Sequence, residues 1–384
     1  MYVVIQDGTQ KTNHFLTIPL IFYFASHMQN PIRVGVVGYG IAAQVMHLPF
    51  ITTLREYQLV SILERHHNHS QEKYPQVRVV RTIEEMVNDS ELDLIVITTP
   101  NDTHLEYTQK ALLAGKHVVL EKPFTITSED ARLLIECSRK VNRVLSVFHN
   151  RRYVNDFLTI KMLLGEKLLG DIVEFEAHYD RYRPGAKPNA WREENKPGSG
   201  ILYDLGAHLI DQALYLFGIP KTITADVRLQ RPHAKTDDYF DLGLDYGFTR
   251  VILKACMYVR EPGPRYLIHG VNGSFIKYGE DPQEALLRAG EFPPRPHWGE
   301  EPEEFWGLLH TEIDGKIIKE KYPSVPGNFY LYYQHLFQTL SNGAPLLEKP
   351  EHGFNTIRMI ELALESNRKK CSIDCNGFLS VVYG

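Results

Sequence analysis

Short apolar runs alternate with longer amphipathic stretches in the first part of the chain. These runs occupy residues 33–37, 58–63, 92–98, 117–120 and 144–147. Their aliphatic and β-branched content is typical of strands that are buried on both faces of a parallel sheet. Between them, the stretch 104–114 carries apolar residues at helical spacing, and Gly115 follows it as a typical helix stop. The alternation predicts an α/β domain with a doubly wound parallel sheet over residues 31–150.

The pattern changes after Asn150. Alternating apolar and polar positions then predict strands joined by Gly, Pro and Asp turns, without helices long enough for further parallel units. The predicted strands span 172–179, 222–229, 240–246, 249–259 and 265–269, and the predicted helices span 157–164, 203–217, 328–340 and 351–366. We expect a second α/β domain at 151–372, built on a large and mainly antiparallel sheet, with residues 373–384 as a tail.

The first residues of the chain need a separate explanation. Residues 15–25 are apolar, but they are too few to span a bilayer and are interrupted by Pro19. A secretory signal is the weaker alternative, because only Lys11 precedes the run as a basic residue. Met28 stands just before the first predicted strand. We therefore expect residues 1–30 to be an extension that is either disordered or, over residues 1–27, an upstream segment that is not translated.

Composition narrows the class of protein. The 384 residues include 43% hydrophobic and 23% charged residues, with a formal net charge of -5, as in globular proteins without a basic surface for nucleic acid. Four scattered cysteines argue against a disulfide framework and favour a reducing compartment. We expect a cytoplasmic protein with free thiols and with neither a membrane nor a nucleic acid as its partner.

A glycine-rich turn follows the first predicted strand. Its sequence, Gly38-Tyr39-Gly40-Ile41-Ala42-Ala43, has the pattern G-x-G-x-x-A at a junction between a strand and a helix. The first glycine permits a tight turn, the second permits close approach of a pyrophosphate, and the small third residue lets helix and strand pack closely. Unpaired N–H groups around Ile41 and Ala42 would face the phosphates. The turn predicts a dinucleotide cofactor.

The end of the second predicted strand bears on which dinucleotide is bound. Glu64 stands where an acidic residue accepts hydrogen bonds from a free ribose 2′-hydroxyl, which favours NAD. Arg65 follows it and is suited to a 2′-phosphate, which favours NADP. We expect the protein to use NAD or NADP, or both. The histidines that follow in 64–70 have no cysteine or carboxylate cluster beside them, so we expect no metal site.

Two later strand ends would meet the cofactor at the same edge of the sheet. Thr98, Thr99, Pro100 and Asn101 end one strand, with His104 starting the next helix, and Glu121 and Lys122 end another. Small polar groups there suit a ribose or nicotinamide, although Pro100-Asn101 is equally typical of a simple turn. Lys122 is equally compatible with a surface turn.

Asp204 and His208 are the second candidate group. They lie four residues apart on a predicted helix, and therefore on one face, one turn apart. Ile201, Leu202 and Leu205 make this helix too apolar to be fully exposed. We predict a buried functional pair in preference to a surface ion pair.

These motifs together resemble the family of glucose-fructose oxidoreductase and inositol dehydrogenase. G-x-G-x-x-A, Glu121-Lys122-Pro123 and Asp204-x-x-x-His208 occur in that order, and the resemblance covers Pro31 to Ser372. The segments HNRRYVNDFLTIK, RYRPGA and GPRYLIHGVNGSFIKYG are most similar to the NADP-dependent scyllo-inositol dehydrogenases of that family. The resemblance implies a Rossmann domain, an α/β domain with an open-faced sheet, and a homodimer or homotetramer. It also implies that Lys122, Asp204 and His208 are the catalytic residues.

The expected chemistry is dehydrogenation of a polyol or sugar. Removing a proton from oxygen and a hydride from carbon needs a base and a positive group near the alkoxide. His208 is the expected base, Lys122 the expected stabiliser of the oxygen, and Asp204 the residue that fixes the substrate or the imidazole. A polyol also needs many hydrogen-bond partners and an apolar wall. The candidates for these contacts are Arg152, Tyr153, Asp156, Tyr182, Arg183, Trp191 and Arg192.

Other functions share the same motifs. Some relatives are sensors or regulators that bind the nucleotide without catalysis, but these usually lack the lysine or the histidine that this chain retains. Aldose reduction and NAD-dependent glycoside cleavage also use this fold, and the latter begins with a hydride step. The sequence leaves open which polyol is used and in which direction. The dehydrogenase hypothesis requires Lys122 and His208 to face the same cleft.

Overall fold

The first half of the chain forms a parallel sheet in a computed structural model that describes residues 30–185, 191–381 and 383. The order of its six strands is β3-β2-β1-β4-β5-β6, and all neighbouring pairs are parallel. The strands are β1 Ile32–Val37, β2 Tyr57–Leu63, β3 Arg78–Val80, β4 Leu94–Ile97, β5 His117–Leu120 and β6 Leu145–Val147. The prediction of a doubly wound parallel sheet is confirmed.

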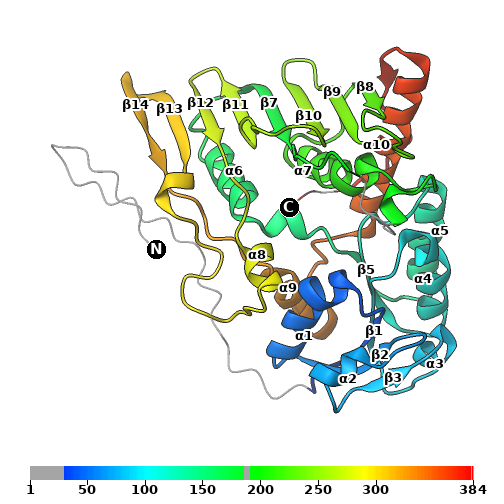
Figure 1. Ribbon diagram of the computed structural model, residues 1–384. Helices are drawn as coiled ribbons and strands as arrows, with labels where there is room; N and C mark the ends of the chain where they lie inside the picture. Colours follow the sequence, from blue (N-terminus) through cyan, green and yellow to red (C-terminus); the bar gives the residue numbers. More distant parts are fainter. Residues whose placement is uncertain (1–29, 186–190, 382, 384) are drawn as a thin grey trace. The chain divides into compact units, whose positions relative to one another are not determined.

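Helices flank this sheet, as the alternating pattern predicted (Figure 1). They are α1 Leu48–Thr53, α2 His69–Lys73, α3 Ile83–Val87, α4 His104–Leu113 and α5 Ser128–Lys140, with α9 Tyr330–Asn342 contributed from late in the chain. A π-helical segment, Ala42–His47, leads from the glycine-rich turn directly into α1. Helix α9 packs beside α1. The late part of the chain therefore covers the same side of the sheet as the glycine-rich turn.

A nine-stranded sheet follows, in the order β14-β13-β12-β11-β7-β10-β9-β8-β15. Only the β7–β10 pair is parallel, so the expected mainly antiparallel sheet is confirmed. Its strands are β7 Ile172–His178, β8 Thr222–Arg228, β9 Tyr239–Asp245, β10 Arg250–Cys256, β11 Tyr266–Gly270, β12 Gly273–Lys277, β13 Gly307–Ile313, β14 Lys316–Tyr322 and β15 Ile373–Asp374. The remaining helices are α6 Asn155–Gly165, α7 Ala207–Phe217, α8 Gln283–Arg288 and α10 Pro350–Lys369.

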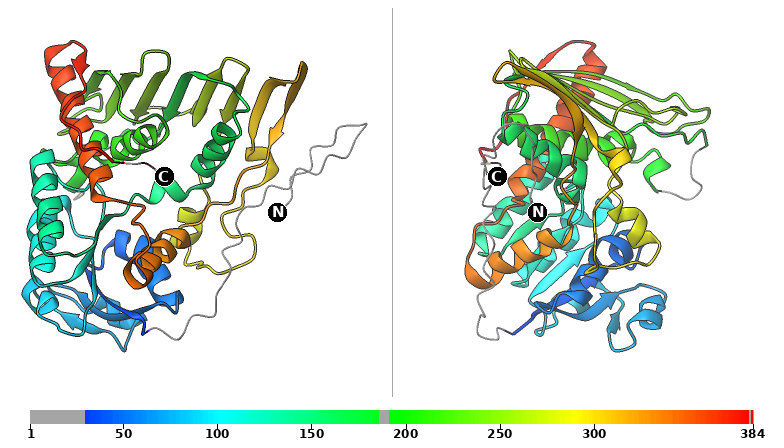
Figure 2. Two further views of the ribbon diagram at one scale, coloured as in Figure 1. Left: turned by 180° about the vertical axis from the view of Figure 1, so that it is seen from behind. Right: turned by 90° about the vertical axis from the view of Figure 1, so that its left-hand side faces the viewer.

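One face of this second sheet packs on helices, and Figure 2 shows helices on that side only. On the packed face, Phe175 of β7 is fully buried and its ring lies 5.3 Å from that of Phe217 of α7. On the other face, Leu267 and Ile276 are direct cross-strand neighbours and remain half-buried. This alternation is the physical basis on which the strands were predicted.

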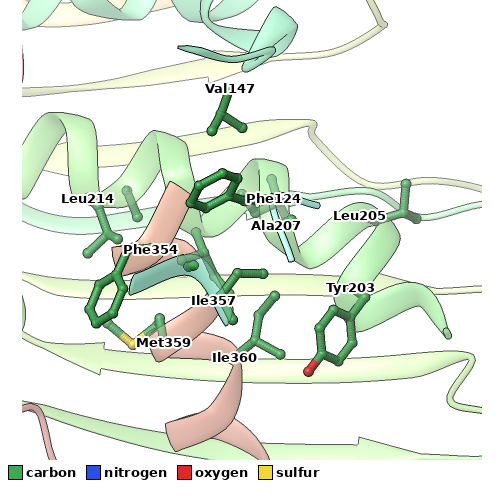
Figure 3. Packing of buried hydrophobic residues seen from close by; sticks show 14 of the residues in the cluster. Phe124, Val147, Tyr203, Leu205, Ala207, Leu214, Phe354, Ile357, Met359 and Ile360 are labelled. Carbon is green, nitrogen blue, oxygen red and sulfur yellow. The ribbon is translucent and has the colours of Figure 1, made fainter. Parts of the chain in front are cut away.

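Helix α10 connects the two sheets through the hydrophobic core. Figure 3 shows Phe354, Ile357 and Ile360 of α10 among core residues that include Phe124, which follows β5, and Tyr203, which precedes α7. One continuous cluster of buried side chains therefore contains residues from both halves of the chain. The packing fixes the end of β5 relative to the start of α7, where the candidate catalytic residues lie.

The structure tests some of the remaining expectations from the sequence and leaves others open. Residues 31–384 form one compact unit, so the proposed boundaries at 150 and 372 stay predictions. The expectation for residues 1–27 lies outside the described residues. All four cysteines are free thiols, as expected. No helix within the described residues is long and apolar enough to cross a membrane.

Candidate active site

The glycine-rich turn leaves room for a ligand beside its backbone. Gly38 adopts a φ of +97°, which is a backbone conformation that favours glycine, and a side chain there would meet Thr98 Oγ1 at 3.1 Å. A Cβ on Gly40 would meet nothing within 4 Å. The backbone is therefore open where a pyrophosphate would approach, and the turn fits a dinucleotide.

The predicted contacts after β4 hold several loops together. Thr98 donates a hydrogen bond to the Val37 carbonyl, and Asn101 Nδ2 donates to the Gly198 carbonyl at 2.8 Å. The His104 ring lies between the Pro123 and Thr99 carbonyls, each 3.0 Å from one of its nitrogens. A small pocket beside Lys122 is nevertheless lined by Thr98, Thr99, Asn101 and His104. Pro100 is exposed and does not line it.

Glu64 lies at the end of β2, as predicted, but its carboxylate already has partners. Oε1 accepts the Ser70 N–H at 2.8 Å and Oε2 accepts the His69 N–H at 3.1 Å. Both oxygens therefore stabilise the first turn of α2, and Glu64 is 8% exposed. Arg65 is exposed, and its side chain has no ion pair or hydrogen bond within the described part of the chain.

A cavity of about 1330 Å³ runs from the glycine-rich turn to the start of α7. Its lining includes Ile41 and Ala42 from the turn, Glu121 and Lys122 from the end of β5, and Asp204 and His208. The structure thus brings Lys122 and His208 to the same cleft, beside the place where the dinucleotide fits. In Figure 1, α7 lies beneath the second sheet, on the side toward β5.

Lys122 is held by Asp204. Its ammonium donates to Asp204 Oδ1 and to the Asp204 backbone carbonyl, both at 2.8 Å. Arg192 Nε lies 3.2 Å from the same carboxylate oxygen. Burial raises the pKa of Asp204, but the charges of Lys122 and Arg192 outweigh it and hold this pKa well below its ordinary value. Asp204 is therefore ionised and keeps the ammonium in the cavity.

Glu121 supports the turn that carries Lys122. Its carboxylate accepts the backbone N–H of Lys122 and a hydrogen bond from His47 Nε2, both at 3.0 Å. Burial alone would raise the pKa of Glu121, but the hydrogen bond and charge of His47 lower it below its ordinary value. Glu121 thus links His47, which ends the π-helical segment after the glycine-rich turn, to Lys122, the candidate catalytic lysine.

His208 is 6% exposed and lines the cavity from α7. Burial, followed by the positive charge of Lys122, lowers the pKa of His208 well below 6.5. The imidazole is therefore neutral at physiological pH and retains a lone pair that accepts a proton. The Tyr179 ring packs edge-on to it at 6.3 Å.

Asp204 and His208 flank a change in helix geometry. Asp204 belongs to a π-helical segment, Leu202–Gly206, and His208 belongs to α7, which continues directly from it. Such segments recur at functional sites because they change the direction of side chains relative to a regular helix. Both side chains line the cavity, as their spacing predicted.

The predicted substrate residues separate into two groups. Arg183, Trp191 and Arg192 line the cavity. Tyr182 lies outside the lining, with the Arg260 guanidinium 3.8 Å from its ring centre.

The other three predicted substrate residues are also outside the lining, because each is buried in an internal contact. Arg152 forms a double hydrogen bond with Asp211, Tyr153 donates to Glu348 at 2.5 Å, and Asp156 faces Arg265 at 3.6 Å. These pairs support the fold behind the cavity, so we do not assign substrate contacts to them.

The cavity is lined by further polar residues that were not predicted from the sequence. They are Asn150, Arg151, Tyr179, Arg181, Glu193, Asp237, Glu280, Asp281, Glu284 and Arg288. Arg151 is the neighbour of the predicted Arg152 on a short 3-10 turn, Asn150–Tyr153, where consecutive side chains point in different directions. The presence of two adjacent arginines was the available signal, but it did not indicate which one faces the ligand. No group of three metal-ligating side chains occurs among the described residues.

The fold combines a parallel sheet and a mainly antiparallel sheet, each packed with helices, and the cavity lies beside the glycine-rich turn. These features define a nucleotide-dependent oxidoreductase. Residues 32–149 match the Gfo/Idh/MocA model described as an oxidoreductase family, NAD-binding Rossmann fold, and residues 161–374 match its C-terminal alpha/beta domain. The chain belongs to the Gfo/Idh/MocA oxidoreductase family, so the resemblance seen in the sequence is confirmed.

Individual relatives match from half of this chain to nearly all of it. The scyllo-inositol 2-dehydrogenase (NADP(+)) IolW of Bacillus subtilis is 44% identical over 342 residues, which are 89% of this chain and 95% of that protein. The D-glucoside 3-dehydrogenase of Escherichia coli is 29% identical over 50% of this chain and 55% of its own length. The structure of yvaA from Bacillus subtilis has a TM-score of 0.87 and 43% identity, covering 90% of this chain and 99% of that one.

Proposed function

We propose that this protein is an NAD(P)-dependent dehydrogenase that oxidises a secondary hydroxyl group of a polyol or sugar, or reduces the corresponding ketone. The observation that carries the proposal is the shared cavity, in which an ammonium held by an ionised carboxylate and a neutral imidazole stand beside the glycine-rich turn. The names of the inositol and glucoside dehydrogenases among its relatives support the same substrate class.

The residues divide the chemistry between them. His208, being neutral, takes the hydroxyl proton at its free ring nitrogen. Lys122 donates a hydrogen bond to the same oxygen and stabilises the negative charge that develops on it. Asp204 keeps the Lys122 ammonium in place through its 2.8 Å hydrogen bond. Hydride acceptance is the chemistry that the nicotinamide supplies when it is bound.

We further propose that NADP is the better cofactor. Glu64 is the feature that favoured NAD, but both of its oxygens are occupied by N–H groups of α2. Arg65 is exposed and has no partner within the described residues, so its guanidinium is available for a 2′-phosphate. The NADP(+) dependence in the name of the Bacillus subtilis relative is consistent with this choice.

The test is a substrate panel followed by absorbance at 340 nm. Purified protein is incubated with NADP or NAD and with inositols, aldoses or glycosides, and the reverse reaction is run with reduced cofactor and keto sugars. We expect net cofactor turnover with at least one polyol, faster with NADP. Release of a sugar from a glycoside without net cofactor turnover would instead identify glycoside cleavage, and binding of cofactor without turnover on any substrate would identify a sensor.

We also propose a homo-oligomer, in the cytoplasm, that forms through the open face of the second sheet. Half-buried aliphatic side chains form a direct cross-strand row there. The row consists of Leu267, Ile276 and Leu308. Covering such a row removes apolar surface from water. Light scattering of the wild type and of Leu267→Lys tests the proposal, and a monomeric wild type would refute it.

A further inference from the structure

The chain continues beyond the region that matches the family. The matched C-terminal region ends at residue 374, and the described residues after it pack back onto α10. Asn355 of α10, which is fully buried, donates from Nδ2 to the Leu379 carbonyl at 3.0 Å and accepts the Leu379 N–H at 2.9 Å. This reciprocal pair of hydrogen bonds fixes the segment in one place.

The segment delivers Tyr383 to a buried cluster. The Tyr383 ring stacks on His352 of α10, with centroids 4.5 Å apart and an interplanar angle of 24°. The Arg152 guanidinium lies 5.9 Å from the Tyr383 ring centre and 5.0 Å from that of Tyr215. Burial raises the pKa of Tyr383 to about 12, so the phenol stays uncharged beside these groups.

Arg152 is the central residue of this cluster. Its guanidinium is 4% exposed and donates to both carboxylate oxygens of Asp211, at 2.6 and 2.8 Å, while another nitrogen contacts His352 Nδ1 at 3.1 Å. A buried ion pair of this kind is stable only while its groups stay fully partnered and shielded. The aromatic rings of Tyr215 and Tyr383 provide that shielding.

Asp211 connects the cluster to the active site. It lies on α7 three residues after His208, one turn further along the helix. It also lies 3.5 Å from the buried ring of His149. The Arg152–Asp211 pair therefore joins α7 to the turn Asn150–Tyr153.

We propose that Tyr383 is a positioning residue of the active site, because it closes the Arg152–Asp211 ion pair from water and so fixes α7 and His208. The inference rests on the proposed function only where turnover is used as its readout. Tyr383 is not one of the residues that line the cavity. Removing its ring is expected to admit water to the ion pair and to loosen the first turns of α7.

The experiment compares Tyr383→Ala with Phe378→Ala, a matched aromatic deletion in the same segment. Phe378 packs on the same core without a ring or cation contact to Arg152 among the described residues. Hydrogen exchange of peptides from α7 provides a readout that does not require activity. We expect faster exchange in α7 for Tyr383→Ala alone, and a kcat about tenfold lower for it at unchanged cofactor affinity, because small displacements of catalytic groups have effects of this order.

Conservative variants complete the test. Tyr383→Phe keeps the ring and is expected to retain wild-type exchange and kcat. Equal α7 exchange in Tyr383→Ala and Phe378→Ala would overturn the inference. If Tyr383→Ala does not fold, Tyr383→Leu and Phe378→Leu are compared by the same criterion. If the wild type turns over no substrate, the proposed function fails, whereas the exchange data still decide this inference.

Discussion

Replacing Arg65 by alanine tests how the protein chooses between its two cofactors. The exposed guanidinium is available for the 2′-phosphate that distinguishes NADP from NAD. A charge-assisted hydrogen bond contributes about 1.5–3 kcal/mol, and each 1.4 kcal/mol corresponds to about tenfold in affinity. We therefore expect NADPH to bind Arg65→Ala about 10- to 100-fold more weakly than the wild type, with little change for NADH.

The assay is a titration of cofactor fluorescence with the purified protein. Arg65→Lys keeps the charge without the planar fork and is expected to lie between the wild type and Arg65→Ala. Arg55→Ala removes another exposed arginine of the same domain and controls for net charge. An equal loss of NADH and NADPH affinity in Arg65→Ala would refute the phosphate assignment.

Glu64→Gln provides the complementary test. A glutamine offers one carbonyl oxygen where the carboxylate accepts two N–H groups, so α2 loses one hydrogen bond and the favourable charge at its start. We expect a free energy of unfolding lower by about 1–2 kcal/mol, with little effect on NADH affinity. A tenfold or greater loss of NADH binding would show that Glu64 contacts the ribose and that our interpretation of its carboxylate is wrong.

The remaining predictions concern the catalytic group. Asp204→Asn removes the carboxylate that holds Lys122 at 2.8 Å, and kcat should fall by about 10- to 100-fold with a smaller change in KM; an unchanged kcat would contradict its role. Because the pKa of His208 lies well below 6.5, the acid limb of kcat/KM should lie below pH 6.5, and a limb at or above 6.5 would contradict the assigned pKa direction. The unfolded imidazole binds a proton below about pH 6.5 whereas the folded one does not, so the free energy of unfolding should fall as pH is lowered from there, measured by denaturant titration.

Much of the fold was predictable because the periodicity of apolar residues is a direct consequence of burial. The parallel strands are mostly apolar, and α7 and α10 have apolar faces, so their patterns were clear. Strands β12, β13, β14 and β15 were missed. In β14, Lys316, Lys319 and Lys321 occupy exposed positions at the edge of the sheet, and this polar pattern does not resemble that of a core strand.

Residues of the candidate site were predictable where they lie at the end of a strand or at helical spacing on one face of a helix. Lys122 and His208 were identified in this way, and both line the cavity. The direction of side chains on irregular turns was not predictable, so Arg152 was chosen where Arg151 faces the cavity. The position of Glu64 was predicted, but its partners were not, because they depend on how α2 folds back onto β2.

The most direct test of the central claim is a double-mutant cycle on Lys122 and His208. Single-turnover hydride transfer is followed at 340 nm for the wild type, Lys122→Met, His208→Asn and the double variant, with cofactor and polyol saturating. If both side chains act on one substrate oxygen, each single variant should lose about 100-fold or more, and the double variant should be little slower than the slower single variant. Losses that multiply fully in the double variant, or a single variant with the wild-type rate, would contradict the account.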